Sequence, residues 1–146
     1  MTQLLLIRHA SAGHRESWIG DDRQRPLDDE GRGQTAALAP TLERFRIERV
    51  LTSPYLRCVQ TVEPLAAARR VPLEYRDELA DDADPAEARR LIGELAAEGK
   101  PAALCAHGDL IQELLAEELP KGAVAVLEAT PKAELIRLET LAPSSV

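Results

Sequence analysis

The sequence predicts an α/β protein, a three-layer α/β/α sandwich whose central sheet is mostly parallel with one antiparallel strand. Short aliphatic runs alternate along the chain with longer segments rich in the helix formers Ala, Leu, Arg and Glu. The last two runs are separated only by Thr130-Pro131-Lys132, which is typical of a hairpin and brings antiparallel pairing into the sheet. A length of 146 residues suits one domain with a sizeable core, which we expect to span 1–146.

The predicted strands are short segments of four to six residues. The first, Leu4–Ile7, consists of four aliphatic residues and is expected to be buried on both faces. The tail over 142–146 is expected to be frayed. The strands are expected at 4–7, 47–52, 71–75, 102–106, 124–129 and 134–139.

The predicted helices mostly begin at residues that favour N-caps. Asp28 precedes two further acidic residues, which suit a first helical turn. Ser53 and Asp84 are each followed by proline, which suits the first helical position. Pro40 and Pro64 are expected to kink the first two helices. The helices are expected at 28–44, 53–69, 84–99 and 110–119, and the long loop over 11–27 is either functional or a plain surface connection.

The composition excludes several classes of function. A net charge of -7 argues against a nucleic-acid polymer or an anionic membrane as partner, although local arginines can still bind a phosphate. No apolar run is long enough to span a membrane and no leader pattern is visible, so we expect a cytoplasmic protein. Cys58 and Cys105 lie in apolar segments and are expected to be buried, reduced thiols. No spacing resembles a zinc site, so neither a metal nor a cofactor is expected.

Three predicted strands end in residues suited to binding an anion. Arg8 and His9 follow the first strand, Arg57 lies soon after the second, and His107 follows the run at 102–106. Any one of these alone is well explained as a solvated strand end. Ligands of open α/β sheets bind at the carboxyl ends of the strands, so the repetition predicts that the four side chains meet in one pocket.

Two arginines and two histidines suit phosphoryl transfer. Arginine binds phosphate oxygens in pairs, a neutral imidazole is a nucleophile toward phosphorus, and a second, protonated imidazole can stabilise the developing charge. We therefore predict a phosphohistidine intermediate formed without a metal. Other phosphate chemistries fit poorly, because the sequence lacks a nucleotide-binding glycine loop and a Gly-x-Ser-x-Gly elbow. The positions six after the two cysteines hold Pro64 and Ile111, where a cysteine phosphatase needs arginine.

Four motifs together resemble the histidine phosphatase superfamily, also called the phosphoglycerate mutase-like fold, over nearly the whole chain. The short length and the lack of cap insertions resemble its SixA-like branch of phosphohistidine phosphatases. The loop over 13–22 also resembles the C-terminal phosphatase domain of some actinobacterial Nudix hydrolases. The motifs are Leu6-Ile7-Arg8-His9-Ala10, Arg25-Pro26-Leu27-Asp28, Thr52-Ser53-Pro54 with Arg57 and Gln60-Thr61, and Ala106-His107-Gly108.

The resemblance implies a role for each matching residue. His9 would be the phosphorylated nucleophile, and Arg8, Arg57 and His107 would complete the catalytic phosphate pocket. It also implies assistance to substrate binding from two further positions, the side chain of Ser11 and the backbone around Gly108.

The proton donor is left open by the resemblance. Many members place a glutamate after the third strand, whereas here Asp81 stands in that position with Glu78 close by. An ordinary acidic loop explains this segment equally well. Ala10 stands where the family usually has glycine, which costs little if its φ is negative.

The favoured function is a metal-independent protein phosphohistidine phosphatase, because a small member without a cap would have an open site. The alternatives are a nucleotide or small-molecule phosphatase of the Nudix-linked type and a phosphoprotein-binding module with low turnover. The partner is therefore a phosphorylated protein or a small phosphorylated substrate. Trp18 either stacks on a substrate base or packs against its loop, and the role of the loop over 13–25 is not determined by the sequence.

Overall fold

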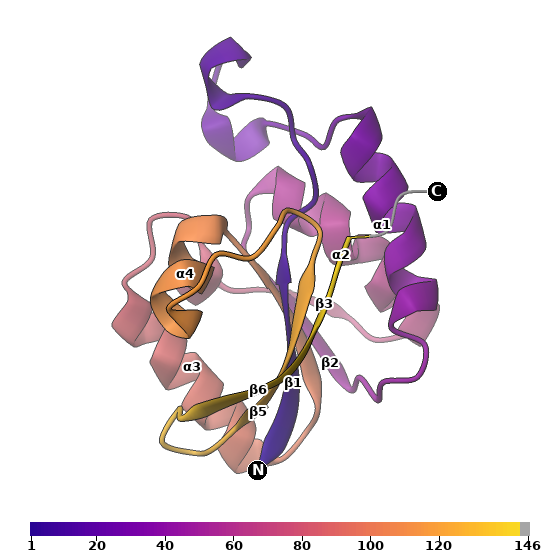
Figure 1. The fold of residues 1–146 in the computed structure, drawn as a ribbon. Coiled ribbons are helices and arrows are strands. Elements are labelled where there is room, and N and C mark those ends of the chain that lie inside the picture. Colours follow the sequence, from indigo (N-terminus) through magenta and orange to yellow (C-terminus); the bar gives the residue numbers. More distant parts are fainter. Residues whose placement is uncertain (144–146) are drawn as a thin grey trace.

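A six-stranded sheet runs through the centre of the molecule and carries helices on both faces (Figure 1). The computed structural model describes residues 1–143, so the predicted fraying of the tail falls largely outside the described residues. The strand order is β3-β2-β4-β1-β5-β6. The strands are β1 (Thr2–Arg8), β2 (Arg49–Thr52), β3 (Leu73–Tyr75), β4 (Ala102–Ala106), β5 (Val124–Ala129) and β6 (Leu135–Leu141).

The pairing of the strands confirms the predicted sheet. The first four strands pair in parallel, while β5 is antiparallel to β1 and forms the predicted hairpin with β6. Several strand bounds differ from the prediction, because backbone pairing decides where a strand begins. Phe45 and Ile47, for example, are buried in the core although they precede β2.

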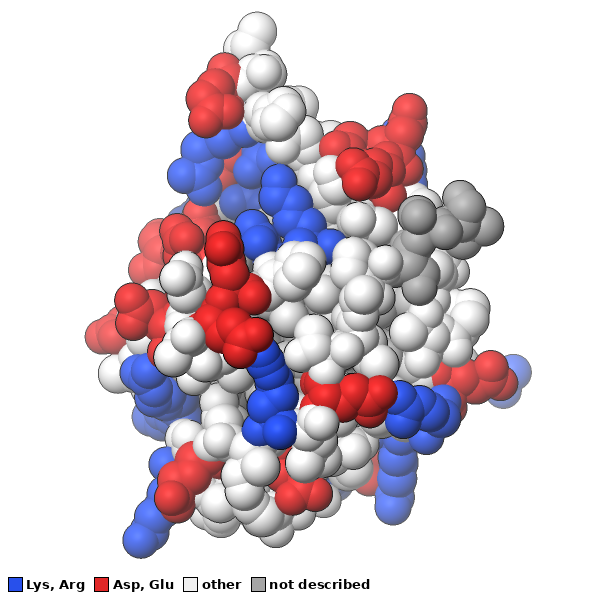
Figure 2. Space-filling model, in the orientation of Figure 1, with Lys and Arg blue, Asp and Glu red and all other residues white. Residues whose placement is uncertain are grey.

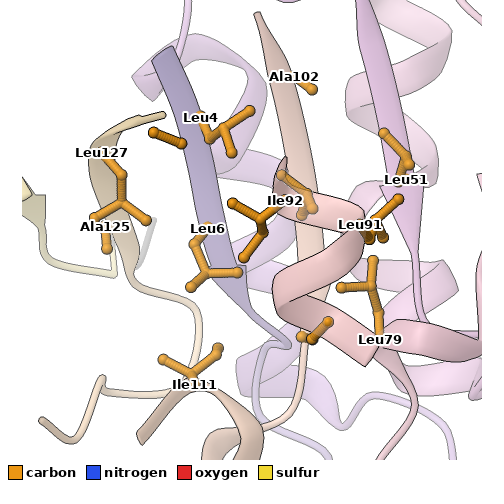
Figure 3. Close-up of a cluster of buried hydrophobic side chains, with 14 of the residues drawn as sticks. Leu4, Leu6, Leu51, Leu79, Leu91, Ile92, Ala102, Ile111, Ala125 and Leu127 are labelled. Carbon is orange, nitrogen blue, oxygen red and sulfur yellow. The ribbon is translucent and has the colours of Figure 1, made fainter. Parts of the chain in front are cut away.

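The two faces of the sheet bury different cores, and alternate residues of β1 point into each. Leu4 and Leu6 pack with α3 and α4 (Figure 3), whereas Leu5 and Ile7 pack with α1 and α2. Helices therefore cover both faces, which confirms the three-layer architecture. The helices are α1 (Asp29–Thr41), α2 (Leu56–Arg69), α3 (Pro85–Glu98) and α4 (Gly108–Leu115). Within residues 1–143 none is long and apolar enough to cross a bilayer.

Two predicted caps are confirmed, and the ends of two helices were predicted wrongly. The side chains of Asp28 and Asp84 accept backbone N–H groups at the starts of α1 and α3. Helix α1 ends at Thr41 rather than near residue 44. Pro40, one residue earlier, has no N–H to donate and so interrupts the hydrogen bonding of the helix. Helix α4 begins at Gly108 and ends at Leu115 rather than spanning 110–119, because the next residue is left-handed.

The start of α2 also differs from the prediction. Ser53 was expected to cap this helix, but α2 begins at Leu56, and Tyr55 takes the N-cap position without a side-chain hydrogen bond. The hydroxyl of Ser53 instead lies beside the ring of His107, as described below.

The carboxyl ends of three neighbouring strands meet at one edge of the sheet. In the ladder between β1 and β4, Arg8 lies opposite Ala106, and the His9 N–H continues it by donating to the Ala106 carbonyl at 3.1 Å. The Ser53 N–H donates to the Cys105 carbonyl at 3.0 Å and joins the end of β2 to β4. The segments after β1, β2 and β4 are thereby held side by side.

Candidate active site

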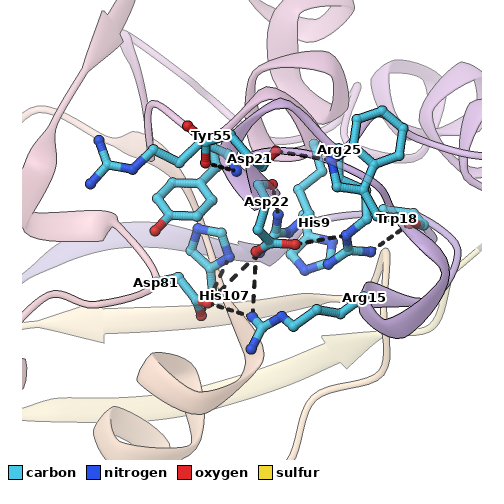
Figure 4. A network of polar contacts seen from close by, with 12 residues as sticks. His9, Arg15, Trp18, Asp21, Asp22, Arg25, Tyr55, Asp81 and His107 are labelled. Atoms are coloured by element: carbon cyan, nitrogen blue, oxygen red, sulfur yellow. Dashed lines mark hydrogen bonds and ion pairs between the residues drawn. The ribbon is translucent and has the colours of Figure 1, made fainter.

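The structure brings the four residues predicted from the strand ends into one pocket. Arg8, His9, Arg57 and His107 all line a cavity of about 330 Å³, and Gly108 lies beside them. The ring centroids of the two histidines are 5.4 Å apart (Figure 4). Both rings are buried, and the Arg57 side chain is only 1% exposed. The pocket is therefore a largely desolvated cluster of cationic and imidazole groups.

His9 presents one nitrogen to its own backbone. Its Nδ1 lies 2.8 Å from the Ala10 carbonyl, which can only accept a hydrogen bond, so Nδ1 carries the proton and Nε2 keeps its lone pair. The pKa of His9 is lowered to about 3, mainly by burial and also by the nearby His107, Arg57 and Arg8, against the opposing effect of the Ala10 carbonyl. His9 is therefore neutral near pH 7, with an unprotonated Nε2.

The low pKa of His9 predicts a specific dependence of stability on pH. The unfolded chain takes up a proton at His9 below its usual pKa of 6.5, while the folded protein does so only near 3. The free energy of unfolding should therefore fall as the pH drops from 6.5 toward 3. Urea denaturation of the wild type and of His9→Gln at several pH values should show a shallower decline in the variant, and identical slopes would contradict the assignment.

Each arginine is anchored through its terminal nitrogens. Arg8 donates from Nη1 to the Leu119 carbonyl at 2.8 Å. Arg57 donates from Nη1 to the Asp22 carbonyl at 2.9 Å and from Nη2 to the Asp22 carboxylate at 3.0 Å. The Nε atoms of both arginines are buried without a hydrogen-bond partner. These anchors fix the guanidinium groups and leave their inner edges available to a ligand.

Three of the four buried side-chain atoms without a partner in residues 1–143 belong to this pocket. They are Nε of Arg8, Nε of Arg57 and Nδ1 of His107, while the fourth is the Thr35 hydroxyl on α1. A buried donor without an acceptor costs about 1–3 kcal/mol. A ligand with several acceptor oxygens, such as a phosphoryl group, would remove this cost.

Gly108 allows Arg8 to approach the N-terminus of α4. A Cβ atom at Gly108 would lie 2.7 Å from Cζ of Arg8, closer than real contacts permit. The glycine therefore creates the space that the guanidinium occupies. Gly108 therefore contributes by lacking a side chain. The N-terminus of α4, which begins at this residue, adds positive potential that favours an anion.

The loop over 11–27 enters the site through Asp22, a residue that belongs to none of the four sequence motifs. The Asp22 carboxylate accepts from Nη2 of Arg57 and, at 2.9 Å, from Nε of Arg25, and Nη2 of Arg15 lies 3.5 Å away. Burial alone would raise the pKa of Asp22, but Arg25 and Arg57 hold it below its usual value. The only sequence signal was the mixture of acidic residues and arginines in a long loop.

Of the two candidate proton donors, Asp81 lies at the pocket and Glu78 does not. One oxygen of Asp81 is 3.7 Å from Nδ1 of His107, and the other accepts from Arg15 at 2.8 Å and lies 3.7 Å from Arg57. Glu78 is instead paired with Arg76, with its closest contact at 2.7 Å. Glu78 is therefore directed away from the site, although it is only three residues from Asp81 in the sequence.

Ser11, which was expected to assist substrate binding, is not among the residues that line the pocket. Its hydroxyl donates to the Asp28 carboxylate at 2.7 Å, and its N–H donates to the Gln34 side chain at 2.9 Å. Ser11 therefore ties the segment after β1 to helix α1. Ala10 has no positive φ, so its methyl group is accommodated without backbone strain.

Three side chains that the motif reasoning did not assign surround His107. The Ser53 hydroxyl oxygen lies 2.8 Å from Nε2, and Sγ of Cys58 lies 3.5 Å from the same nitrogen. The Tyr55 ring is buried and packs edge-on against the imidazole, with centroids 4.8 Å apart. Cys58 and Cys105 are both free and buried, as predicted.

The tip of the loop leaves Trp18 only partly covered. Its indole N–H donates to the Asp21 carbonyl at 2.9 Å and its side chain is 37% exposed, while His14 is exposed at the mouth of the catalytic pocket. The hydrogen bond holds the indole against its own loop. Figure 2 shows basic side chains gathered below this protruding loop, next to a group of acidic ones.

Comparisons with known proteins bear on the family and the fold of this chain. The family model of the histidine phosphatase superfamily (branch 1) matches residues 4–88. The 8-oxo-(d)GTP phosphatase of Mycolicibacterium smegmatis is 35% identical over 115 residues, which are 77% of this chain and 36% of that protein. The chain spans less than half the length of the curated relatives it matches.

Two solved structures have nearly the same fold. The protein histidine phosphatase SixA complexed with tungstate has a TM-score of 0.82 and 26% identity, covering 97% of both chains. The mycobacterial glucosyl-3-phosphoglycerate phosphatase in complex with VO3 has a TM-score of 0.79 and covers 97% of this chain and 100% of its own. At 16% identity, the second comparison concerns the fold alone.

Proposed function

Because the chain belongs to the histidine phosphatase superfamily, we propose that it is a phosphatase, which transfers a phosphoryl group from its substrate to Nε2 of His9 and then to water. The observation that carries this proposal is the set of buried nitrogens without partners on Arg8, Arg57 and His107, which line the same pocket as a neutral His9. Three such groups suit the three non-bridging oxygens of a phosphoryl group.

In the first step, the lone pair on Nε2 of His9 forms a bond to phosphorus while the bond to the leaving group breaks. Arg8, Arg57 and His107 stabilise the charge on the non-bridging oxygens, so most of the catalysis is positioning and electrostatics. We assign the proton that reaches the leaving atom to Asp81 in its acid form, because its carboxyl group lines the same pocket as His9. In the second step, water attacks phosphorus, Asp81 accepts its proton, and phosphate leaves with His9 regenerated.

The substrate that we favour is phosphohistidine on a protein. The mouth of the pocket is formed by exposed residues of the loop, among them His14 and Arg15, so a substrate on a protein surface can approach it. The likeness to SixA at 26% identity over 97% of both chains supports the same class. An imidazole that carries a proton on its second nitrogen is a good leaving group, so no acid is needed at the departing nitrogen and the reaction depends mainly on the cationic pocket.

A nucleotide phosphatase is the second candidate. It is favoured by the 35% identity to a protein named 8-oxo-(d)GTP phosphatase, although this chain spans only 36% of that protein. A phosphoanhydride also provides a good leaving group, and the same four side chains would bind its terminal phosphoryl group. The partly exposed Trp18 offers an aromatic surface near the loop tip for a base.

A direct comparison of substrates tests the proposed class. We expect kcat/KM for a phosphorylated histidine-containing domain to exceed that for nucleoside di- and triphosphates by at least about tenfold, a difference of about 1.4 kcal/mol. The His9→Gln variant serves as the blank for each substrate. The opposite order assigns the protein to the nucleotide class, and tight binding of every substrate without turnover would instead identify a phosphoprotein-binding module.

A further inference from the structure

The two ring nitrogens of His107 lie in different surroundings. Nε2 points inward, 2.8 Å from the Ser53 hydroxyl oxygen and 3.5 Å from Sγ of Cys58. Nδ1 is buried without a hydrogen-bond partner, and its nearest charged neighbour is the Asp81 carboxylate at 3.7 Å. Asp81 lines the catalytic pocket, so Nδ1 is the nitrogen on the ligand side of the ring.

The contacts of Ser53 determine the direction of its hydrogen bond to His107. Its hydroxyl oxygen already accepts from the Tyr55 N–H at 3.2 Å. Within residues 1–143, Nε2 of His107 is the one acceptor in reach of the hydroxyl hydrogen. Ser53 is fully buried, so this hydrogen would otherwise have no partner. Nε2 therefore accepts, and the ring proton belongs on Nδ1.

We infer that Ser53 is a positioning residue that holds His107 as a neutral imidazole with its proton on Nδ1. In this tautomer Nδ1 donates to a phosphoryl oxygen, whereas the other tautomer would direct a lone pair at that oxygen and repel it. The consequence for catalysis rests on the proposed function, but the tautomer is a property of the free protein.

The two histidines then differ in function because each has a different partner. The Ala10 carbonyl binds the Nδ1 proton of His9 and leaves Nε2 as a nucleophile. Ser53 donates to Nε2 of His107 and leaves Nδ1–H as a donor. Both rings carry the proton on Nδ1, yet one offers a lone pair and the other a hydrogen. This assignment replaces the protonated second imidazole that the sequence suggested with a neutral donor.

The contact between Ser53 and His107 also explains why Ser53 does not cap α2. Its hydroxyl is bound to Tyr55 N–H and to His107, and the helix begins only at Leu56 without a side-chain cap. A local preference for capping has been overridden by a contact across 54 residues. Such a departure from a local rule is expected where a side chain serves a site.

Cys58 provides a weaker contact to the same nitrogen. A thiol is a poor hydrogen-bond donor, but at 3.5 Å from Nε2 it can partly replace the hydroxyl when Ser53 is removed. We therefore expect the Cys58→Ala change alone to have a small effect and to increase the effect of Ser53→Ala when the two are combined.

The test measures the tautomer directly. Long-range 1H–15N NMR spectra of the free 16.0 kDa protein with labelled histidine should show Nδ1 of His107 protonated and Nε2 unprotonated. In Ser53→Ala, the tautomer protonated on Nε2 should gain population. With a phosphorylated substrate, kcat should fall by roughly tenfold, which corresponds to about 1.4 kcal/mol, while KM should change much less.

Two further variants keep the test specific. Ser53→Thr retains a hydroxyl and should restore the wild-type spectrum and most of kcat. Thr35→Val removes a buried hydroxyl that has no partner, and it should change neither the spectrum of His107 nor kcat. Protonation of Nε2 in the wild type, in a neutral ring or an imidazolium, overturns the inference, as does an unchanged tautomer in Ser53→Ala. Failure of the proposed function would appear differently, as a wild-type protein that forms no phosphoryl adduct on His9.

Discussion

Replacing His9 by alanine is expected to lower kcat for an aryl phosphate by at least about a thousandfold, because the variant has no nucleophile to accept the phosphoryl group. The remaining cationic pocket should still bind the substrate, so KM should change far less than kcat. The His14→Ala variant is the matched control, since His14 is exposed on the loop at the mouth of the same pocket. Hydrolysis by His9→Ala at the wild-type rate would refute the mechanism.

The same experiment can reveal the intermediate. Wild-type protein mixed briefly with a substrate carrying a labelled phosphoryl group and then denatured should carry one label on His9. A bond between phosphorus and imidazole nitrogen is labile in acid and stable in base, which separates it from a phosphoserine or an acyl phosphate. The His14→Ala variant should be labelled like the wild type, and His9→Ala should remain unlabelled. A label that resists acid would point to another nucleophile.

Replacing Arg57 by methionine is expected to have the second-largest effect, because it removes positive charge from the pocket and the partner of Asp22 together. The Arg57 side chain is 1% exposed, and it donates to both the backbone carbonyl and the carboxylate of Asp22. We expect kcat/KM to fall by at least about a hundredfold, the scale found when a preorganised donor to a developing charge is lost.

The stability of Arg57→Met should fall as well. Asp22 would keep its hydrogen bond to Arg25 at 2.9 Å but would lose its contacts with Arg57. The free energy of unfolding, measured by urea denaturation, should therefore fall by an amount on the order of 1–3 kcal/mol. Adding Asp22→Asn should recover part of this stability without recovering activity. The control is Arg23→Met, an exposed arginine on the same loop whose contact with Asp82 is 3.8 Å long. Equal losses in Arg57→Met and Arg23→Met would show that Arg57 has no special role.

The sequence by itself determined the layers of the fold and the edge of the sheet that carries the site. Aliphatic runs must be buried wherever they occur, and caps such as Asp28 and Asp84 act on N–H groups within three residues of themselves. These are local effects, so they can be recognised without knowing what lies across the sheet. His9 and His107 can be recognised in this way, because each lies within two residues of the end of a predicted strand.

Only the tertiary structure decided which neighbours those residues have. Asp22 reaches Arg57 across 35 residues, and Ser53 leaves its expected capping role to contact His107 across 54. Asp81 and Glu78 were both candidate proton donors in the sequence, but only Asp81 lies at the pocket. The protonation of the two imidazoles depends on burial and on single hydrogen bonds to distant atoms. These depend on distances in the folded chain, which no local pattern of residues encodes.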